Sequence, residues 1–258
     1  MIPNRMHAAL LLLVMGPALF APIAGTQAPS AVHPANIEAH PLPNGIEVSR
    51  NGVKLQVTAL RDDILRVRAG QNGKLGEDAS WAVLDTSRTA SVPVTPEATG
   101  FSTKALRVSF DSDLRLTVSD LFGHILQQDE RATEFHGSAF RLYKTMAPEE
   151  HFFGLGDKVG PLDRRNQAFT DWNTDAFGWQ ESTDPTYKSI PFFLSWNHGR
   201  VLGVLFDNTW RASFDFGKES ATAYSFGSPG GPALDWLYVL RMNDVFAVLP
   251  KIARLAHG

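Results

Sequence analysis

The sequence predicts an all-β fold in which antiparallel strands form a sandwich. Short segments that alternate apolar and polar residues follow one another along the chain, and Gly, Asp, Asn or Ser bounds each of them. Helical spacing of apolar residues is prominent only at the C-terminal end. Hydrophobic residues make up 43% of the 258 residues and charged residues 20%, so the chain can bury a core. Many strands without intervening helices favour packed sheets.

The first residues have the pattern of an export signal. Arg5 precedes an apolar run over residues 8–20, and small residues then lead into a polar, proline-containing stretch. We expect a signal peptide over residues 1–28, with cleavage between Ala24 and Ala28. The apolar run is shorter than the ~20 residues that a membrane-spanning helix needs; an uncleaved anchor is the alternative. The expected location is the periplasm or the exterior of a bacterial-type cell, with no membrane contact after processing.

The composition of the chain argues against several kinds of site and partner. It contains no cysteine, so disulfides and thiolate metal sites are excluded. A net charge of -3 without a basic stripe argues against a nucleic-acid partner, because phosphate binding relies on clustered Lys and Arg. The histidines lack the paired spacing of metal ligands. We expect no metal and no cofactor.

The folded domain is expected over residues 45–241, after a flexible lead-in. Residues 29–44 are rich in Pro, Ala and His without apolar periodicity, which is typical of such a lead-in. The predicted strands of the first half are 46–49, 54–59, 64–69, 106–110 and 114–118. Those of the second half are 189–195, 201–207, 212–216 and 236–240.

One predicted strand shows its two faces clearly. Leu65, Val67 and Ala69 form one face, while Arg66 and Arg68 form the other, which is the period of two expected for a strand.

A short C-terminal helix is predicted over residues 242–258. Asn243 or Asp244 can cap it, and apolar residues then recur at helical spacing. Pro250 would kink or split this helix.

The most informative stretch runs from Gly154 to Trp236. It contains GLGDKVGPLDRR, DWNTDAFGW, DPTYKSIPFFLSW, GVLFDNTWRASFDFG and GGPALDW. This series resembles the domain that precedes the catalytic barrel in family 31 glycoside hydrolases, and the resemblance extends more weakly back to about Val53. It implies an antiparallel β-supersandwich of the galactose-mutarotase-like type, packed in the full-length protein against a (β/α)8 barrel that this chain lacks.

The DWNTDAFGW segment is the predicted contact with a carbohydrate. Short polar groups between aromatic rings suit a sugar, whose hydroxyls need polar partners and whose C–H faces stack on rings. The resemblance implies that Asp175 hydrogen-bonds the substrate sugar, and we add Trp172, Asn173 and Trp179 as substrate-binding candidates. The alternative is that Asn173 and Asp175 only form an Asx-turn.

Two neighbouring motifs are expected to be structural. Gly154 to Asp157, GLGD, predicts a tight turn where backbone approaches backbone. Asp207 to Gly217, DNTWRASFDFG, predicts a hairpin whose aromatic residues support the core. Alternatively, Trp210 and Arg211 face the barrel of the longer protein, which would leave an apolar patch on this domain.

No catalytic residue is expected within the chain. Retaining cleavage of a glycoside needs two carboxyl groups ~5–5.5 Å apart. The family takes both from its barrel, and its nucleophile motif does not occur here. Glu149 and Glu150 are adjacent, so they would point to opposite faces of a strand, and we expect them in a solvated turn.

Sugar epimerisation by a His and a carboxylate is a second enzymatic possibility. The candidates would be His124, His136, His151 and His198, but none lies in a motif that matches such an enzyme.

Three hypotheses about function remain. The chain is the N-terminal part of an exported α-glycosidase acting on α-linked glucosides, xylosides or related sugars, and is inactive alone. Alternatively, it is a free-standing carbohydrate-binding module, or an inactive truncated remnant.

Overall fold

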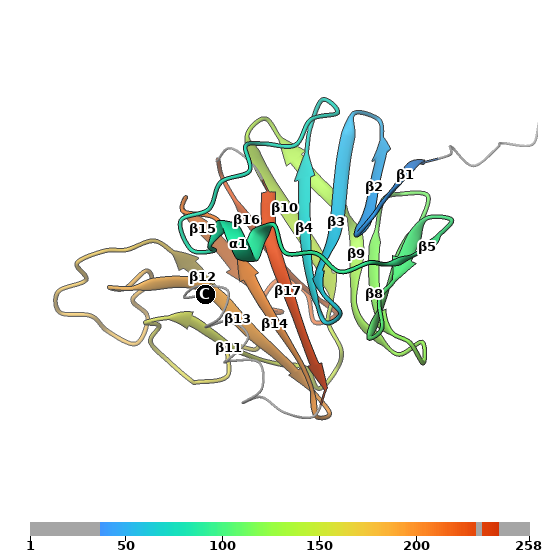
Figure 1. Ribbon diagram of the computed structural model, residues 1–258. Helices are drawn as coiled ribbons and strands as arrows, with labels where there is room; N and C mark the ends of the chain where they lie inside the picture. The colour runs from blue at the N-terminus through green and yellow to red at the C-terminus, as the bar shows by residue number, and fades with distance from the viewer. Residues whose placement is uncertain (1–36, 231–233, 243–258) are drawn as a thin grey trace, which may run out of the picture. The chain divides into compact units, whose positions relative to one another are not determined.

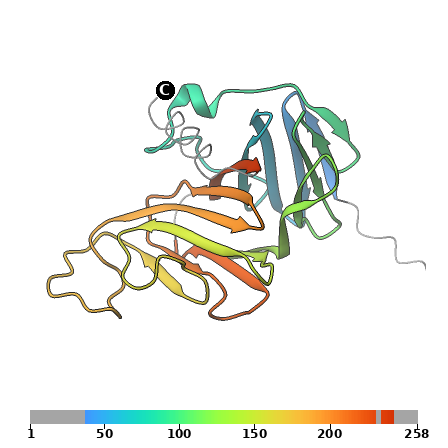
Figure 2. The ribbon, with the colours of Figure 1, turned by 90° about the horizontal axis from the view of Figure 1, so that it is seen from below.

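The computed structural model describes residues 37–230 and 234–242, which form an all-β fold of two large sheets (Figures 1 and 2). Every strand pair is antiparallel, so the predicted fold class is confirmed. The predicted signal peptide lies outside the described residues, as do residues 243–258 of the predicted C-terminal helix. Met242, where that helix was predicted to begin, is instead the last residue of a strand. Within those residues, no helix is long and apolar enough to cross a membrane.

The first sheet has eight strands in the order β1-β2-β3-β4-β17-β14-β13-β11. Residue 234 begins its central strand, which joins the first four strands to the later hairpin. The bounds are β1 Glu38–Leu42, β2 Gly45–Arg50, β3 Val53–Arg61, β4 Ile64–Gly70, β11 His151–Gly156, β13 Ser189–Asn197, β14 Arg200–Phe206 and β17 Leu234–Met242.

The second sheet has nine strands in the order β12-β15-β16-β10-β9-β8-β7-β6-β5. A single helical turn, α1, precedes it in the chain. The bounds are α1 Asp85–Arg88, β5 Thr95–Glu97, β6 Gly100–Ser102, β7 Leu106–Phe110, β8 Leu116–Asp120, β9 Ile125–His136, β10 Ala139–Thr145, β12 Ala168–Asp171, β15 Ala212–Asp215 and β16 Ala223–Ser228.

One continuous core joins the two sheets. Its centre is aromatic: Phe152 of β11 stacks on Phe216, with ring centroids 4.5 Å apart, and Phe193 of β13 meets Phe226 of β16 edge-on. All four rings are at most 1% exposed. Tilted and edge-on aromatic pairs add to the burial of apolar area, so this cluster fixes the end of the sandwich from which the candidate site is built.

The folded part begins earlier than the sequence suggested. Strand β1 lies inside residues 29–44, the predicted flexible lead-in, and pairs residue by residue with β2. It is an edge strand with mostly exposed side chains, so it needs no apolar alternation. Pro41 is tolerated there because an edge strand has one side without ladder bonds.

The two faces of β4 are both covered. Arg66 and Arg68 oppose the apolar face, yet they are only 5% and 8% exposed. Arg66 donates two hydrogen bonds to the Asp78 carboxylate, and Arg68 donates to the Gly76 carbonyl oxygen. The segment after β4 therefore folds back over the arginines and binds their guanidinium groups.

Candidate functional site

The DWNTDAFGW segment begins at the end of β12 and continues as a long loop, residues 172–188, that leads into β13. Figures 1 and 2 show this loop projecting beyond the ends of the neighbouring strands. Its two ends are tied together by reciprocal bonds: Trp172 N donates to Ser189 Oγ at 2.8 Å, and Ser189 N donates to Asn173 Oδ1 at 2.7 Å. Asn173 therefore closes the neck of the loop, and its side-chain oxygen is not engaged in an Asx-turn.

Further hydrogen bonds fix the conformation of the loop. Thr174 N and Oγ1 both donate to the Thr186 carbonyl oxygen, at 3.3 and 3.0 Å. Tyr187 Oη donates to the Ala176 carbonyl oxygen at 3.1 Å. The first half of the loop is thus bonded to its second half.

Beyond the neck, the loop exposes an acid and two large rings. Phe177 is 96% exposed and Trp179 54% exposed. Asp175 is also exposed, and its carboxylate makes no hydrogen bond or ion pair with any residue that the structure describes. Rings and a carboxylate with no competing partner are the groups that a sugar needs from a protein.

A cavity of about 490 Å³ lies at the base of the loop. Trp172 and Trp210 line it, each about half exposed, together with the apolar side chains of Ile190 and Leu205. Asn208 Nδ2, also at this cavity, is buried and has no hydrogen-bond partner within the described ranges. The four predicted residues are therefore divided: Trp172 and Asn173 line this cavity, whereas Asp175 and Trp179 lie farther out on the loop.

A buried charge cluster supports the same end of the loop. Lys158 Nζ lies 3.0 Å from Asp171 Oδ1 and 3.5 Å from Asp184 Oδ1. It also donates to the Thr170 carbonyl oxygen at 2.6 Å. Asp184 Oδ2 accepts a hydrogen bond from Thr170 N at 2.6 Å, so the cluster joins β12 to the last part of the loop.

Burial dominates the electrostatics of this cluster. Removal of the Asp171 carboxyl from water raises its pKa to about 6, while the nearby Lys158 charge opposes that rise. Asp171 Oδ2 has no hydrogen-bond partner in the part of the chain that the structure describes. A buried carboxyl with an unused oxygen at the cavity wall can accept a hydrogen bond from a ligand.

No local sequence pattern predicts several of these groups as part of the site. Lys158 directly follows the GLGD motif and lies 13 positions before Asp171, and Asp184 begins the DPTYKSIPFFLSW segment; neither is a predicted site residue. Sheet pairing brings them together. Trp210 was considered as part of an apolar patch, and its 56% exposure agrees with that alternative.

The GLGD motif is a bulge rather than a turn. Gly154, Leu155 and Gly156 all have positive φ, and the register between β11 and β13 shifts between the two glycines. A Cβ on Gly154 would lie 2.5 Å from the Phe192 carbonyl oxygen. The expected close approach of backbone to backbone is therefore present, within a strand pair.

The adjacent glutamates differ from the expected solvated turn. Glu149 is exposed, but Glu150 is only 7% exposed and accepts hydrogen bonds from Ser195 Oγ and, at 2.9 Å, from Ala147 N. The neighbouring sheet covers Glu150, so the pair is half buried.

The candidate histidines are scattered. His124 contacts Asp120, His151 contacts Asp163, and His198 lies 3.6 Å from Glu149. His136 is exposed at the end of β9. Among the described residues, no three His, Asp or Glu side chains converge in the way that metal ligands do.

Comparison with known proteins agrees with this architecture. Residues 54–215 match the family model described as the glycosyl hydrolase 31 N-terminal galactose mutarotase-like domain. Alpha-glucosidase 2 of Bacillus thermoamyloliquefaciens is 32% identical over 189 residues, which are 70% of this chain and 24% of that protein. Alpha-xylosidase XylQ of Lactiplantibacillus pentosus is 30% identical over 86 residues, 33% of this chain and 10% of that protein.

A solved structure shows the same arrangement of strands. The glycoside hydrolase 31 dextranase of Flavobacterium johnsoniae, in a complex with isomaltotriose, superposes with a TM-score of 0.74 at 28% identity. The superposition covers 86% of this chain and 27% of the dextranase. The chain thus spans about a quarter of the length of these two relatives. Because the family model covers more than half of the chain, this protein belongs to glycoside hydrolase family 31 and contains that family's N-terminal galactose mutarotase-like domain.

Proposed function

We propose that this chain is the N-terminal, sugar-contacting and structural domain of an exported α-glycosidase that hydrolyses O-glycosyl bonds. The observation that carries the proposal is the projecting loop over residues 172–188, which is tied at its neck and presents the unpaired Asp175 carboxylate. In this proposal the catalytic carboxylates belong to a (β/α)8 barrel of a longer protein. The domain supports that barrel and extends the loop over its mouth.

Asp175 acts in substrate binding. Its carboxylate accepts hydrogen bonds from sugar hydroxyls, and hydrogen bonds to a charged acceptor are about twice as strong as neutral ones. The bonds across the loop neck hold the backbone on either side of it, so little ordering of the loop is needed when the sugar binds.

The substrate class follows from the relatives. Two of them are named as an alpha-glucosidase and an alpha-xylosidase, and the dextranase was solved with isomaltotriose. We infer an α-linked glucoside or xyloside as the substrate of the whole protein.

The chain alone does not hydrolyse its substrate. Asp171 at the end of β12 and Asp184 within the loop both lie against Lys158 Nζ. Retaining cleavage needs one carboxylate free to attack and one carboxylic acid free to protonate the leaving oxygen. Two carboxyl groups that share one lysine serve to position the loop.

Export is the proposed location because residues 1–28 combine a basic start, an apolar run and small residues.

A free-standing carbohydrate-binding module is the second candidate. The observation that favours it is the group of exposed rings, Trp172, Trp179 and Trp210, on and below the loop. Under this alternative the isolated chain would bind α-glucosides without any other domain.

The mass of the native product tests the proposal. An antibody raised against this domain isolates the protein from its producer, and intact mass spectrometry and an assay with a chromogenic α-glucoside follow. We expect a species several times heavier than 28.3 kDa that releases the chromophore. A species near 28.3 kDa, less its signal peptide, without activity would reject the α-glycosidase.

A further inference from the structure

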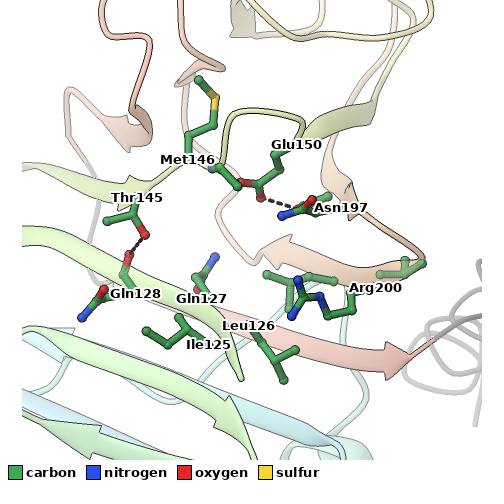
Figure 3. A pocket seen from close by; sticks show the side chains of 13 residues that line it. Ile125, Leu126, Gln127, Gln128, Thr145, Met146, Glu150, Asn197 and Arg200 are labelled. Carbon is green, nitrogen blue, oxygen red and sulfur yellow. Dashed lines mark hydrogen bonds between the residues drawn. The ribbon is translucent and has the colours of Figure 1, made fainter. Parts of the chain in front are cut away.

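A second cavity lies far from the loop, at the other end of β13. It has a volume of about 360 Å³ and is formed where β9, β13 and β14 meet the segment after β10 (Figure 3). Ser189 marks the loop neck and Asn197 lines this cavity. Since a strand rises about 3.3 Å per residue, the two places are separated by roughly 25 Å along β13.

Unpaired hydrogen-bonding groups gather at this cavity. Gln127 is only 5% exposed; its Nε2 donates to Tyr224 Oη, and its Oε1 is buried without a partner among the described residues. Asn197 Oδ1 is likewise buried and unpaired. Arg200 points its guanidinium toward the same space in Figure 3 and makes no hydrogen bond or ion pair with the residues described.

The acidic side chain at this cavity, Glu150, already has hydrogen-bond donors on both oxygens. Glu150 lines the cavity, but Ser195 Oγ donates to its Oε1 and Ala147 N donates to its Oε2. The cavity therefore offers two acceptors without partners among the described residues, Gln127 Oε1 and Asn197 Oδ1, and two donor groups, the Arg200 guanidinium and Asn197 Nδ2.

This combination selects a class of ligand. A carboxylate or phosphate would bind Arg200 but would face two carbonyl oxygens, and a cation would face the guanidinium. A hydroxyl group both donates and accepts, so a ligand with several hydroxyls satisfies all three side chains. A ligand that leaves these polar groups without partners would lose binding free energy, so a ligand with hydroxyls is favoured over an apolar one.

Size and apolar surface agree with a small ring. Ile125, Leu126, Met146 and Leu202 line the cavity and can pack against C–H groups. Small-molecule sites usually measure about 300–1,000 Å³, so this volume suits one or two sugar units. The geometry points to a second carbohydrate site at this cavity, which binds a neutral sugar through Gln127, Asn197 and Arg200, independently of the 172–188 loop.

Isothermal titration of the 258-residue chain with D-glucose and with maltose tests this site. We expect saturable binding that weakens about tenfold to a hundredfold in Arg200→Leu, because this change removes a charged hydrogen-bond donor. Ile125→Trp is the second variant: Ile125 is 53% exposed, so the larger ring blocks the cavity without entering the core, and binding should again be lost. Arg61→Leu is the matched control, since Arg61 is exposed and does not line this cavity; it should bind as the unmodified chain does. Asp175→Ala reports separately on the 172–188 loop.

Three results would overturn the proposal. The first is the absence of saturable binding by the folded chain up to about a hundred millimolar sugar, which corresponds to less than about 1.4 kcal/mol of binding free energy. The second is unchanged affinity in both cavity variants. The third is binding of D-gluconate that is tenfold or more tighter than that of D-glucose. Loss of binding in Asp175→Ala alone would place the sugar on the loop. None of these outcomes depends on whether the native protein is an α-glycosidase, so the two proposals fail separately.

Discussion

Lys158 and Asp171 form an almost fully buried ion pair beneath the projecting loop, with 3.0 Å between Nζ and Oδ1 and side-chain exposures of 1% and 4%. The pair costs desolvation energy on both sides and is compensated by the further bonds of Lys158 to Thr170 and Asp184. Its position at the end of β12 fixes where the loop leaves the sheet.

Asp171 should make stability depend on pH in the direction opposite to that of a carboxylate whose pKa is lowered in the folded protein. Its pKa in the folded protein is raised to about 6 by burial, against about 3.9 in an unfolded chain. The folded state therefore holds more protons between about pH 4 and about pH 6, and the free energy of unfolding falls as pH rises through that window.

In the variant Asp171→Asn, the side chain at this position does not titrate between about pH 4 and about pH 6. Relative to the unmodified chain, its free energy of unfolding should rise by about 1–3 kcal/mol from about pH 4 to above about pH 6. Urea unfolding of both proteins across this range measures the difference, with Asp175→Asn as an exposed control. A difference that stays flat would mean that Asp171 is already ionised at the acid end.

A second buried ion pair joins two neighbouring strands of the second sheet. Lys144 of β10 is 0% exposed and binds the carboxylate of Asp129 of β9, which also accepts a hydrogen bond from Leu116 N at 2.9 Å. Burial lowers the pKa of Lys144 and raises that of Asp129. Lys144→Met leaves the carboxyl without its cation and should cost about 3–5 kcal/mol of unfolding free energy.

The double variant Lys144→Met with Asp129→Leu distinguishes pairing from packing. Replacing both partners by apolar residues should recover much of the loss, although Leu116 N then loses its acceptor. Chemical denaturation of the two single variants and the double variant measures the coupling. If the double variant is as unstable as the sum of the single ones, the ion pair contributes nothing beyond its packing.

Strand β9 shows why part of the fold could not be predicted from the sequence. Its inward positions include Gln127 and Asp129, which pair with Tyr224 and Lys144 inside the core. Because hydrophobic periodicity assumes that inward residues are apolar, a strand that buries paired polar groups is invisible to it. Strands with apolar inward residues, such as β4, β7 and β14, were predicted within one residue at each end.

The candidate site was predictable only in part, for a related reason. The motif around Trp172 marks the 172–188 loop as a candidate site, because aromatic and polar residues alternate within a single segment. Lys158 and Asp184 lie in segments that carry the family resemblance, but only strand pairing and the long loop bring the two side chains together. The neck bond from Ser189 N to Asn173 is likewise a long-range contact.

Gly154 should be the glycine of this region that tolerates substitution least. Its φ is +130°, and an added Cβ would lie 2.5 Å from the Phe192 carbonyl oxygen. Gly154→Ala should cost about 2–4 kcal/mol through strain and overlap. Gly137→Ala is the matched control, since Gly137 also has positive φ but nothing lies within 4 Å of its Cβ position; it should cost about 1–2 kcal/mol. Thermal unfolding that shows equal losses would mean that the strands at Gly154 separate easily.

Substitutions of Asn173 and Asp175 should have different effects, because Asn173 anchors the loop whereas Asp175 is proposed to bind the substrate. Asn173 Oδ1 accepts the neck bond from Ser189 N, so Asn173→Ala should destabilise the protein by about 1 kcal/mol and speed hydrogen exchange over residues 172–188. Asp175 is exposed and makes no such bond with the described residues, so Asp175→Ala should change neither stability nor exchange.

If the loop contacts substrate in the longer protein, Asp175→Ala should instead lower kcat/KM for an α-glucoside about tenfold or more, because a charged acceptor for sugar hydroxyls is lost. Unchanged kcat/KM in Asp175→Ala would remove that residue from substrate binding, whatever the exchange data show for Asn173.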